Sequence, residues 1–219
     1  MKVIVFGGTG MVGQGVLREC LRDARVTEVL AIGRGSTGLT DPKLREVVQP
    51  DPADLSALSD ELPGIDACFF CLGVSSVGMK EDEYRRITYD LTMRVARTLA
   101  DANPKMTFIY VSGQGTDSTE RGRTMWARVK GKTENDLLAL PFRAYMFRPG
   151  FIQPKDGVIS KTPLYRAAYA VTGPLIPVLK RLAPNIVNDN REIGRAMISV
   201  AESGSDIRVL TPRDITARA

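Results

Sequence analysis

The chain of 219 residues contains no histidine, only three cysteines and little unbroken hydrophobic sequence. Without imidazole, Ser-His-Asp and Cys-His catalysis, histidine metal ligation and imidazole pH switching are excluded. Three cysteines do not form the disulfide framework of a small secreted protein. Cys68 and Cys71 are spaced as C-x-x-C, but they lie in an apolar run that predicts a strand, where residues three apart face opposite sides. We therefore expect two small core residues rather than a metal site.

Targeting and membrane-spanning segments are also missing from the pattern. A strand pattern begins at Lys2, which leaves no room for the three regions of a signal peptide. The apolar stretch 167–179 is shorter than the roughly 18–20 residues that cross a bilayer, and Gly173, Pro174 and Pro177 interrupt it. We expect a cytoplasmic protein with reduced thiols.

The composition is that of a folded globular protein. Hydrophobic residues make up 43% of the chain and charged residues 25%, which excludes a disordered or collagen-like chain. The 30 basic residues exceed the 25 acidic ones, for a net charge of +5. This excess suits an anionic ligand, but it is too small and dispersed to predict nucleic-acid binding.

Short apolar runs alternate with helical patterns through the first 150 residues. The runs are Val/Ile/Phe-rich, as in strands that are covered on both faces, and repeated βα units predict a parallel sheet with helices on both sides. The expected strands are 3–6, 28–33, 45–49, 66–72, 107–112 and 143–148, and the expected helices are 12–23, 54–61, 81–102 and 125–140.

The composition changes after Gly150. Residues 151–190 hold five prolines between short apolar pieces. A last helix is expected from Asn188 or Asp189, as its cap, to about Glu202, followed by a short strand at 207–210. We predict one domain over 1–219, in which 151–219 forms a small lobe on the substrate side.

The strongest local motif is a glycine loop between the first strand and the first helix. Gly7 permits the tight turn, Gly10 lets the backbone approach a pyrophosphate, and Gly13 lets the helix pack closely on the strand. Together with Thr9, Met11 and Val12, these residues predict a dinucleotide site in a doubly wound α/β sheet, the Rossmann fold. The alternative is a glycine-rich turn in another α/β protein.

Arg34, at the end of the second strand, indicates which nicotinamide cofactor is bound. NAD sites usually place Asp or Glu there for the ribose 2′-hydroxyl, whereas a guanidinium suits a 2′-phosphate, and no carboxylate stands at this position. We predict NADP(H), with NAD as the second choice. The alternative is a solvated surface arginine.

In this order, the motifs resemble the extended or atypical short-chain dehydrogenase/reductase superfamily, which includes NAD(P)-dependent epimerase/dehydratases. Within it, the chain is similar to the small Tat-interacting-protein-like oxidoreductases. The resemblance covers roughly residues 1–200 and implies a cofactor site and a catalytic pair. It places Asp51 near the adenine, Leu72, Gly73 and Val74 under the adenosine ribose, Ser112 at the catalytic serine, Lys130 at the lysine of Y-x-x-x-K, and Arg148, Pro149 and Gly150 beside the nicotinamide.

The sequence departs from this family at the catalytic tyrosine, where it has Trp126. Indole is only a hydrogen-bond donor, so it cannot relay the proton that the phenol would give or take. Thr88 stands where many extended members have asparagine. Other tyrosines could replace the missing one, without a motif behind them: Tyr84, Tyr89, Tyr165 and Tyr169, with Tyr110 expected to be structural.

Each catalytic candidate also has a structural interpretation: Ser112 as a strand cap, Lys130 as part of a solvated basic helix face, and Trp126 as a core or rim anchor. Two functions therefore stay open. The chain is either an NADP(H)-dependent oxidoreductase or epimerase-like enzyme on a small or lipophilic carbonyl or hydroxyl substrate, or a non-catalytic NADP(H)-binding redox sensor or assembly factor that acts through a protein partner. A weaker alternative makes 164–182 a membrane-surface element. By analogy, helices 81–102 and 125–140 would form a homodimer.

Overall fold

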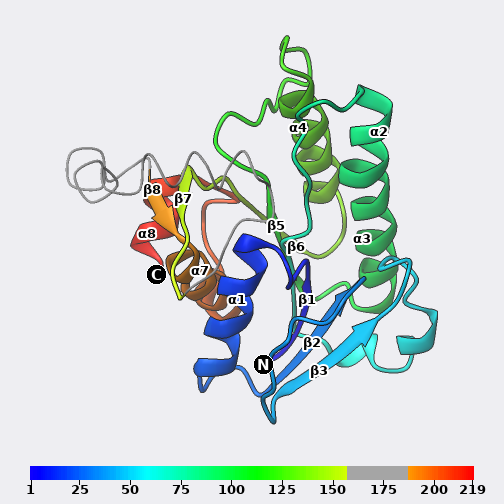
Figure 1. Cartoon of the computed structure of the whole chain (residues 1–219), viewed down its shortest axis with the longest axis vertical. Helices are drawn as coiled ribbons and strands as arrows, with labels where there is room; N and C mark the ends of the chain where they lie inside the picture. Colours follow the sequence, from blue (N-terminus) through cyan, green and yellow to red (C-terminus); the bar gives the residue numbers. More distant parts are fainter. Residues whose placement is uncertain (157–186) are drawn as a thin grey trace.

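The computed structural model describes residues 1–156 and 187–219 and contains one main sheet of seven strands (Figure 1). Every pair of neighbouring strands in it is parallel. The predicted doubly wound parallel sheet is therefore confirmed. In their order across the sheet, the strands are β3 (Leu44–Val48), β2 (Glu28–Gly33), β1 (Lys2–Phe6), β4 (Ala67–Phe70), β5 (Thr107–Val111), β6 (Arg143–Phe147) and β9 (Val209–Leu210).

The order of the strands reverses between β1 and β4. From β1 the chain adds β2 and β3 on one side, then returns to place β4, β5 and β6 on the other. In open α/β sheets, ligands bind beyond the carboxyl ends of the strands at such a switch point. The glycine loop follows β1 directly, so the topology brings it to this point.

Helices cover both faces of the sheet. On one face lie α1 (Met11–Arg22) and α7 (Asn190–Ser203), and their Leu17 and Met197 are buried in one cluster with Val5 of β1. On the other face lie α2 (Glu81–Arg85), α3 (Leu91–Ala102) and α4 (Met125–Leu138) (Figure 1).

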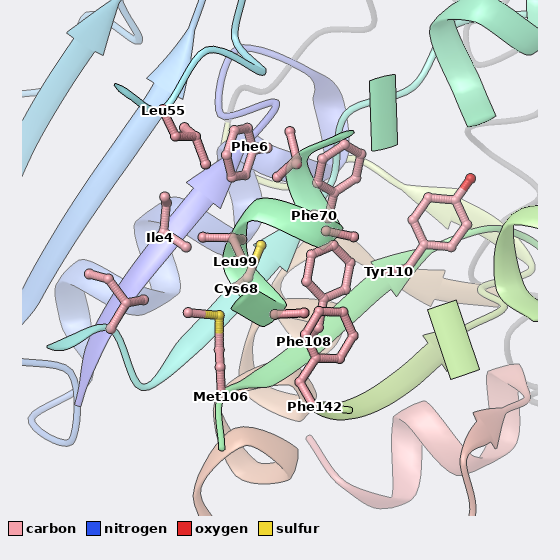
Figure 2. Close-up of a cluster of buried hydrophobic side chains, with 14 of the residues drawn as sticks. Ile4, Phe6, Leu55, Cys68, Phe70, Leu99, Met106, Phe108, Tyr110 and Phe142 are labelled. Carbon is pink, nitrogen blue, oxygen red and sulfur yellow. The ribbon is translucent and has the colours of Figure 1, made fainter. Parts of the chain in front are cut away.

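The core on the α3 and α4 face is rich in aromatic rings (Figure 2). Phe6 and Phe70 have ring centroids 5.3 Å apart, and Phe108 stacks on Phe142 at 5.0 Å. Cys68 is buried in this core, whereas Cys71 packs against the cluster on the opposite face. The two cysteines thus face apart, as predicted.

The helices α1 and α7 approach each other closely. A Cβ atom at Gly15 would lie 2.5 Å from Cβ of Asn190, and one at Gly194 would lie 2.9 Å from Cβ of Glu19. Because real Cβ atoms do not come this close, both positions require glycine, and the contact fixes α1 against the C-terminal part of the chain.

Two of the expected helices differ from the prediction. Residues 54–61 do not form an α-helix; they contain one 3₁₀ turn, Ser56–Leu58, and a second 3₁₀ turn, Leu62–Gly64, follows them. Here Asp54 accepts hydrogen bonds from the backbone and hydroxyl of Ser56, a local bond that competes with helix. The expected helix 81–102 is interrupted by a π-helical turn, Arg86–Asp90, between α2 and α3.

The C-terminal residues contribute to two sheets. Strands β7 (Phe151–Gln153) and β8 (Val187–Asp189) form a small parallel pair, whereas β9 joins the main sheet and leads into α8 (Pro212–Ala217). Asp189 caps α7 through a reciprocal capping box with Glu192, as its sequence position predicted. The segment 164–182, with Tyr165 and Tyr169, lies outside the described residues. In the described ranges, no helix combines the length and the apolar character that crossing a bilayer requires.

Candidate active site

A cleft of about 1630 Å³ lies at the carboxyl ends of the strands. It exceeds the roughly 300–1,000 Å³ of ordinary small-molecule sites, so it has room for a dinucleotide together with a substrate. Segments that follow six neighbouring strands, β3, β2, β1, β4, β5 and β6, line it. From the sequence predictions, the cleft brings together Gly7, Thr9, Gly10, Met11, Val12, Arg34, Asp51, Leu72, Gly73, Val74, Ser112, Trp126, Lys130, Pro149 and Gly150.

The glycine loop is shaped by close backbone contacts. Gly7 has φ +81°, and a Cβ there would lie 2.6 Å from the backbone nitrogen of Leu72. A Cβ at Gly13 would lie 2.1 Å from the carbonyl oxygen of Gly7, so Gly13 packs directly against the backbone of the loop. Gly13 itself does not line the cleft, whereas residues 7–12 do. The amide of Gly10 donates to the carbonyl of Gly7 at 2.9 Å and closes the turn. A larger side chain at Gly7 or Gly13 would destroy this geometry.

The backbone donors in the first turn of α1 have no side-chain cap among the described residues. Its N-cap, Gly10, provides no side-chain cap, and the turn contains no acidic residue. The amino end of a helix without such a cap attracts anions through its N–H groups and its dipole. The loop and helix therefore fit the pyrophosphate of a dinucleotide.

Glu46 of β3 lines the cleft, although no motif in the sequence predicts it there. Arg34 lies exposed at the cleft, but nearby the Glu46 carboxylate accepts hydrogen bonds from Ser36 Oγ at 2.8 Å and from the Thr37 amide at 2.7 Å. These hydrogen bonds outweigh its burial and hold the pKa of Glu46 below its usual value. A carboxylate thus stands in this part of the cleft, although none follows β2 in the sequence.

Asp51 forms an ion pair with Arg94 at the same end of the cleft. Arg94 of α3 donates to Asp51 Oδ2 at 2.8 Å, and the Ala53 amide donates to Oδ1 at 3.0 Å. The hydrogen bond from Arg94 is the largest cause of a lowered pKa for Asp51. No motif in the sequence points to Arg94, which lies on α3, 43 residues after Asp51 along the chain.

Ser112 and Lys130 meet at the other end of the cleft. Lys130 Nζ donates to the backbone oxygen of Ser112, which joins α4 to the end of β5. Burial lowers the pKa of Lys130 to about 8, while Glu134, one helical turn away, acts in the opposite direction. Lys130 is thus a cation on the cleft wall that can lose its proton in mildly alkaline solution.

Trp126 lies one turn before Lys130 and also lines the cleft. Its ring covers Gly115, because a Cβ there would lie 3.3 Å from Cη2 of the indole. The Ser112 hydroxyl, meanwhile, donates to the carbonyl oxygen of Phe147 at 3.1 Å. In this arrangement Ser112 can accept a hydrogen bond from a ligand, and it must turn away from Phe147 to donate one.

Arg148 does not line the cleft. Its Nε donates to the carboxylate of Glu134, whose side chain is 1% exposed, and its Nη2 donates to Glu134 and Ser118. The family resemblance implies that Arg148, Pro149 and Gly150 lie beside the nicotinamide, but of these three only Pro149 and Gly150 line the cleft. The arginine turns away because α4 presents a buried carboxylate that requires a partner.

The tyrosines and Thr88 occupy different surroundings. Tyr84 is buried and lines the cleft, whereas Tyr89 donates to Asp136 and Tyr110 is buried in the aromatic core. Thr88 is buried in the π-helical turn, and its hydroxyl has no hydrogen-bond partner within residues 1–156 and 187–219. Among the described tyrosines, Tyr84 alone lines the cleft.

In the described part of the chain, no group of three or more potential metal ligands comes together.

Comparison with known proteins agrees with this arrangement of fold and cleft. The profile of the NAD dependent epimerase/dehydratase family matches residues 3–121. The chain belongs to this family. The curated relatives include protein fmp52-2, mitochondrial, of Aspergillus terreus, which is 26% identical over 92% of this chain and 87% of that protein. Protein HTATIP2 of Rattus norvegicus is 26% identical over 85% of this chain and 81% of its own length.

Solved structures share the fold at low sequence identity. A short chain dehydrogenase from Burkholderia cenocepacia in complex with NADP superposes with a TM-score of 0.64 at 15% identity, over 97% of this chain and 89% of that one. The enzyme WbmF from Bordetella bronchiseptica in complex with NAD+ gives a TM-score of 0.66 at 16% identity, over 99% of this chain and 76% of its own. Such likeness supports the Rossmann-type sheet.

Proposed function

We propose that this chain is an NADP(H)-dependent oxidoreductase or epimerase-like enzyme that acts on a small or lipophilic carbonyl or hydroxyl substrate. The observation that carries the proposal is the junction of Ser112 and Lys130 in the same cleft as the glycine loop. When bound, a nicotinamide dinucleotide supplies or accepts the hydride. The loop and the first turn of α1 hold its pyrophosphate, and Arg34 binds the 2′-phosphate of the NADP form.

The side chains at the other end of the cleft orient the substrate. Lys130 donates to the nicotinamide ribose, and Ser112 polarises the substrate oxygen after its hydroxyl turns from Phe147. Trp126 forms an apolar wall but transfers no proton. In the reducing direction the carbonyl carbon gains the hydride and its oxygen gains a proton from water or from another group of the substrate. Without the usual phenol, we expect turnover to be slower by about 10²–10⁴-fold.

Titration of the single tryptophan tests cofactor binding directly. Trp126 lines the cleft, so its fluorescence should change on addition of NADPH, at lower concentrations than with NADH. A panel of aldehydes, ketones and alcohols, followed by NADPH absorbance, then tests turnover. Failure to bind either coenzyme at millimolar concentration would contradict the proposal, and so would binding without turnover of any substrate.

The second candidate is a non-catalytic NADP(H)-binding redox sensor or assembly factor. It is favoured by Trp126 in place of an acid–base group and by the Ser112 hydroxyl directed at Phe147. This candidate requires a protein partner whose affinity depends on the coenzyme. Partner capture with and without NADPH, followed by measurement of both affinities, distinguishes it from the enzyme.

The location and assembly of the protein are further proposals. We predict a cytoplasmic homodimer, whereas the fmp52-2 relative is named as mitochondrial. Cell fractionation and light scattering would test the two parts of this prediction separately.

A further inference from the structure

A second, smaller cavity opens beside the cleft, and we call it the annex. It has a volume of about 360 Å³ and is lined by Gln114, Gly115, Arg148, Thr211, Pro212 and Arg213. Gln114 and Gly115 line the cleft as well, so the two spaces adjoin at this loop. Trp126 covers Gly115, which places the annex next to the wall that carries Ser112 and Lys130. Its volume is at the lower limit for small-molecule sites and suits part of a ligand.

The walls of the annex come from the ends of two paired strands. Arg148 follows β6, and Thr211, Pro212 and Arg213 follow β9. The Arg148 amide donates to the carbonyl of Leu210 at 2.9 Å, which fixes the two segments against each other. The described residues that line the annex include two arginines and no carboxylate.

The two arginines differ in whether they have a partner among the described residues. Glu134 neutralises Arg148, but Nη1 of Arg148 makes no hydrogen bond with the described residues. Arg213 is exposed and makes neither an ion pair nor a hydrogen bond within residues 1–156 and 187–219. In the annex, therefore, the charge of Arg213 has no partner in these ranges, and the guanidinium of Arg148 can still donate a hydrogen bond. The side-chain amide of Gln114 lies at the border with the cleft.

We propose that the annex binds the carboxylate or phosphate group of the substrate, whose carbonyl or hydroxyl group lies in the adjoining cleft. This inference rests on the proposed oxidoreductase function and narrows its substrates to anionic ones. Guanidinium groups bind carboxylate and phosphate through charge-assisted hydrogen bonds, and Arg213 is the residue whose charge is available for this. Arg148 stays paired with Glu134, and its Nη1 provides a further hydrogen-bond donor for the anionic group.

Equilibrium binding tests the annex without requiring turnover. Protein saturated with NADP+ is titrated calorimetrically with para-formylbenzoate, para-formylphenyl phosphate and the neutral methyl para-formylbenzoate. We expect at least one anion to bind about tenfold more tightly than the ester, as a charge-assisted hydrogen bond would produce. The tighter anion identifies the preferred group. Equal affinity of all three compounds would overturn the proposal.

Variants locate the effect at Arg213. Arg213→Ala should remove the preference for the anion, whereas Arg143→Ala should keep it, because Arg143 is exposed at the start of β6, at the opposite end of the sheet from the cleft. Equal losses in both variants would overturn the assignment to the annex. With NADPH, Arg213→Ala should raise KM for the anionic aldehyde about tenfold and leave kcat unchanged. An anion preference that depends on Arg213 without any turnover would support the annex and contradict the oxidoreductase function.

Discussion

The two ends of the cleft are built in different ways. The end with the glycine loop depends on backbone contacts that exclude side chains, such as the approach of Gly13 to Gly7. The other end depends on the chemistry of Ser112, Trp126 and Lys130. One substitution at a side-chain site can change the chemistry and leave the fold intact, whereas a substitution under the loop would move the backbone. The presence of tryptophan at 126 beside an intact glycine loop agrees with this difference.

The largest expected effect is a gain of activity at Trp126. Trp126→Tyr places a phenol one turn before Lys130, whose ammonium would lower the pKa of that phenol. If the remaining groups are competent for catalysis, the rate of NADPH oxidation with a carbonyl substrate should rise by about 10²–10⁴-fold. Trp126→Phe is the control, since it reshapes the wall without adding a proton donor. Equal rates in the two variants would favour the sensor.

A methyl group at Gly13, next to the glycine loop, should strongly weaken cofactor binding. Gly13→Ala forces Cβ into contact with the carbonyl oxygen of Gly7, so the loop must move away from the pyrophosphate. We expect at least about a 100-fold loss of NADPH affinity, since several hydrogen bonds to a charged group are lost together. Gly64→Ala, with nothing within 4 Å of the added carbon, is the matched control. Thermal unfolding of both variants separates loss of binding from loss of fold, and unchanged affinity in Gly13→Ala would refute this role of the loop.

At the other end, cofactor affinity should depend on pH through Lys130. Its pKa of about 8 means that the side chain is a cation at pH 7 and mostly neutral at pH 9. The anionic coenzyme is attracted by the cation, so affinity should fall as pH rises, by about tenfold between pH 7 and 9 if only the charged form binds. Lys130→Met should bind more weakly at pH 7 and show no such fall. A parallel fall in both proteins would assign the titration to another group.

The same low pKa affects the stability of the fold. Because the pKa of Lys130 is below that of an unfolded lysine, the unfolded chain binds more protons between pH 8 and the usual lysine pKa of about 10.4. The contribution of Lys130 to the free energy of unfolding therefore rises with pH across this window. Urea unfolding of the native protein and of Lys130→Met at several pH values would measure the difference.

The smallest expected effect concerns the choice of coenzyme. Arg34→Ala should weaken NADPH binding up to about fivefold and leave NADH binding unchanged, since an exposed charge pair contributes at most about 1 kcal/mol. Arg97→Ala, also exposed but on α3, provides the control for net charge. If NADPH and NADH lose affinity equally in Arg34→Ala, the arginine does not read the 2′-phosphate.

The sequence predicts those features that depend on neighbours along the chain. The apolar runs of β1 and β4, the glycine loop and a helix cap at Asn188 or Asp189 are all local predictions, and all occur as expected, with Asp189 as the cap. The prediction of a helix over 54–61 is wrong, because the side chain of Asp54 accepts a hydrogen bond from the Ser56 amide and so competes with helical hydrogen bonds.

Features that depend on packing between elements escape sequence reasoning. Glu46 reaches the cleft because β3 pairs with β2 in a register that aligns it with Ala31. Arg148 leaves the cleft because α4 buries Glu134 behind it. Neither relation is visible in the spacing of motifs, since each joins residues from separate elements whose register and rotation are set by the folded sheet.

The close packing of α1 against α7 also has a consequence for the synthesis of the protein. Residues 190–203 support the helix that carries the nucleotide loop, yet more than 160 residues of sequence separate them from it. A ribosome synthesises the chain from its amino terminus, so the glycine loop and α1 leave the exit tunnel early. Helix α7, which packs against α1, leaves it only near the end of synthesis. A nascent chain stalled before residue 190 should therefore lack a coenzyme site, although every glycine of the motif has already been translated.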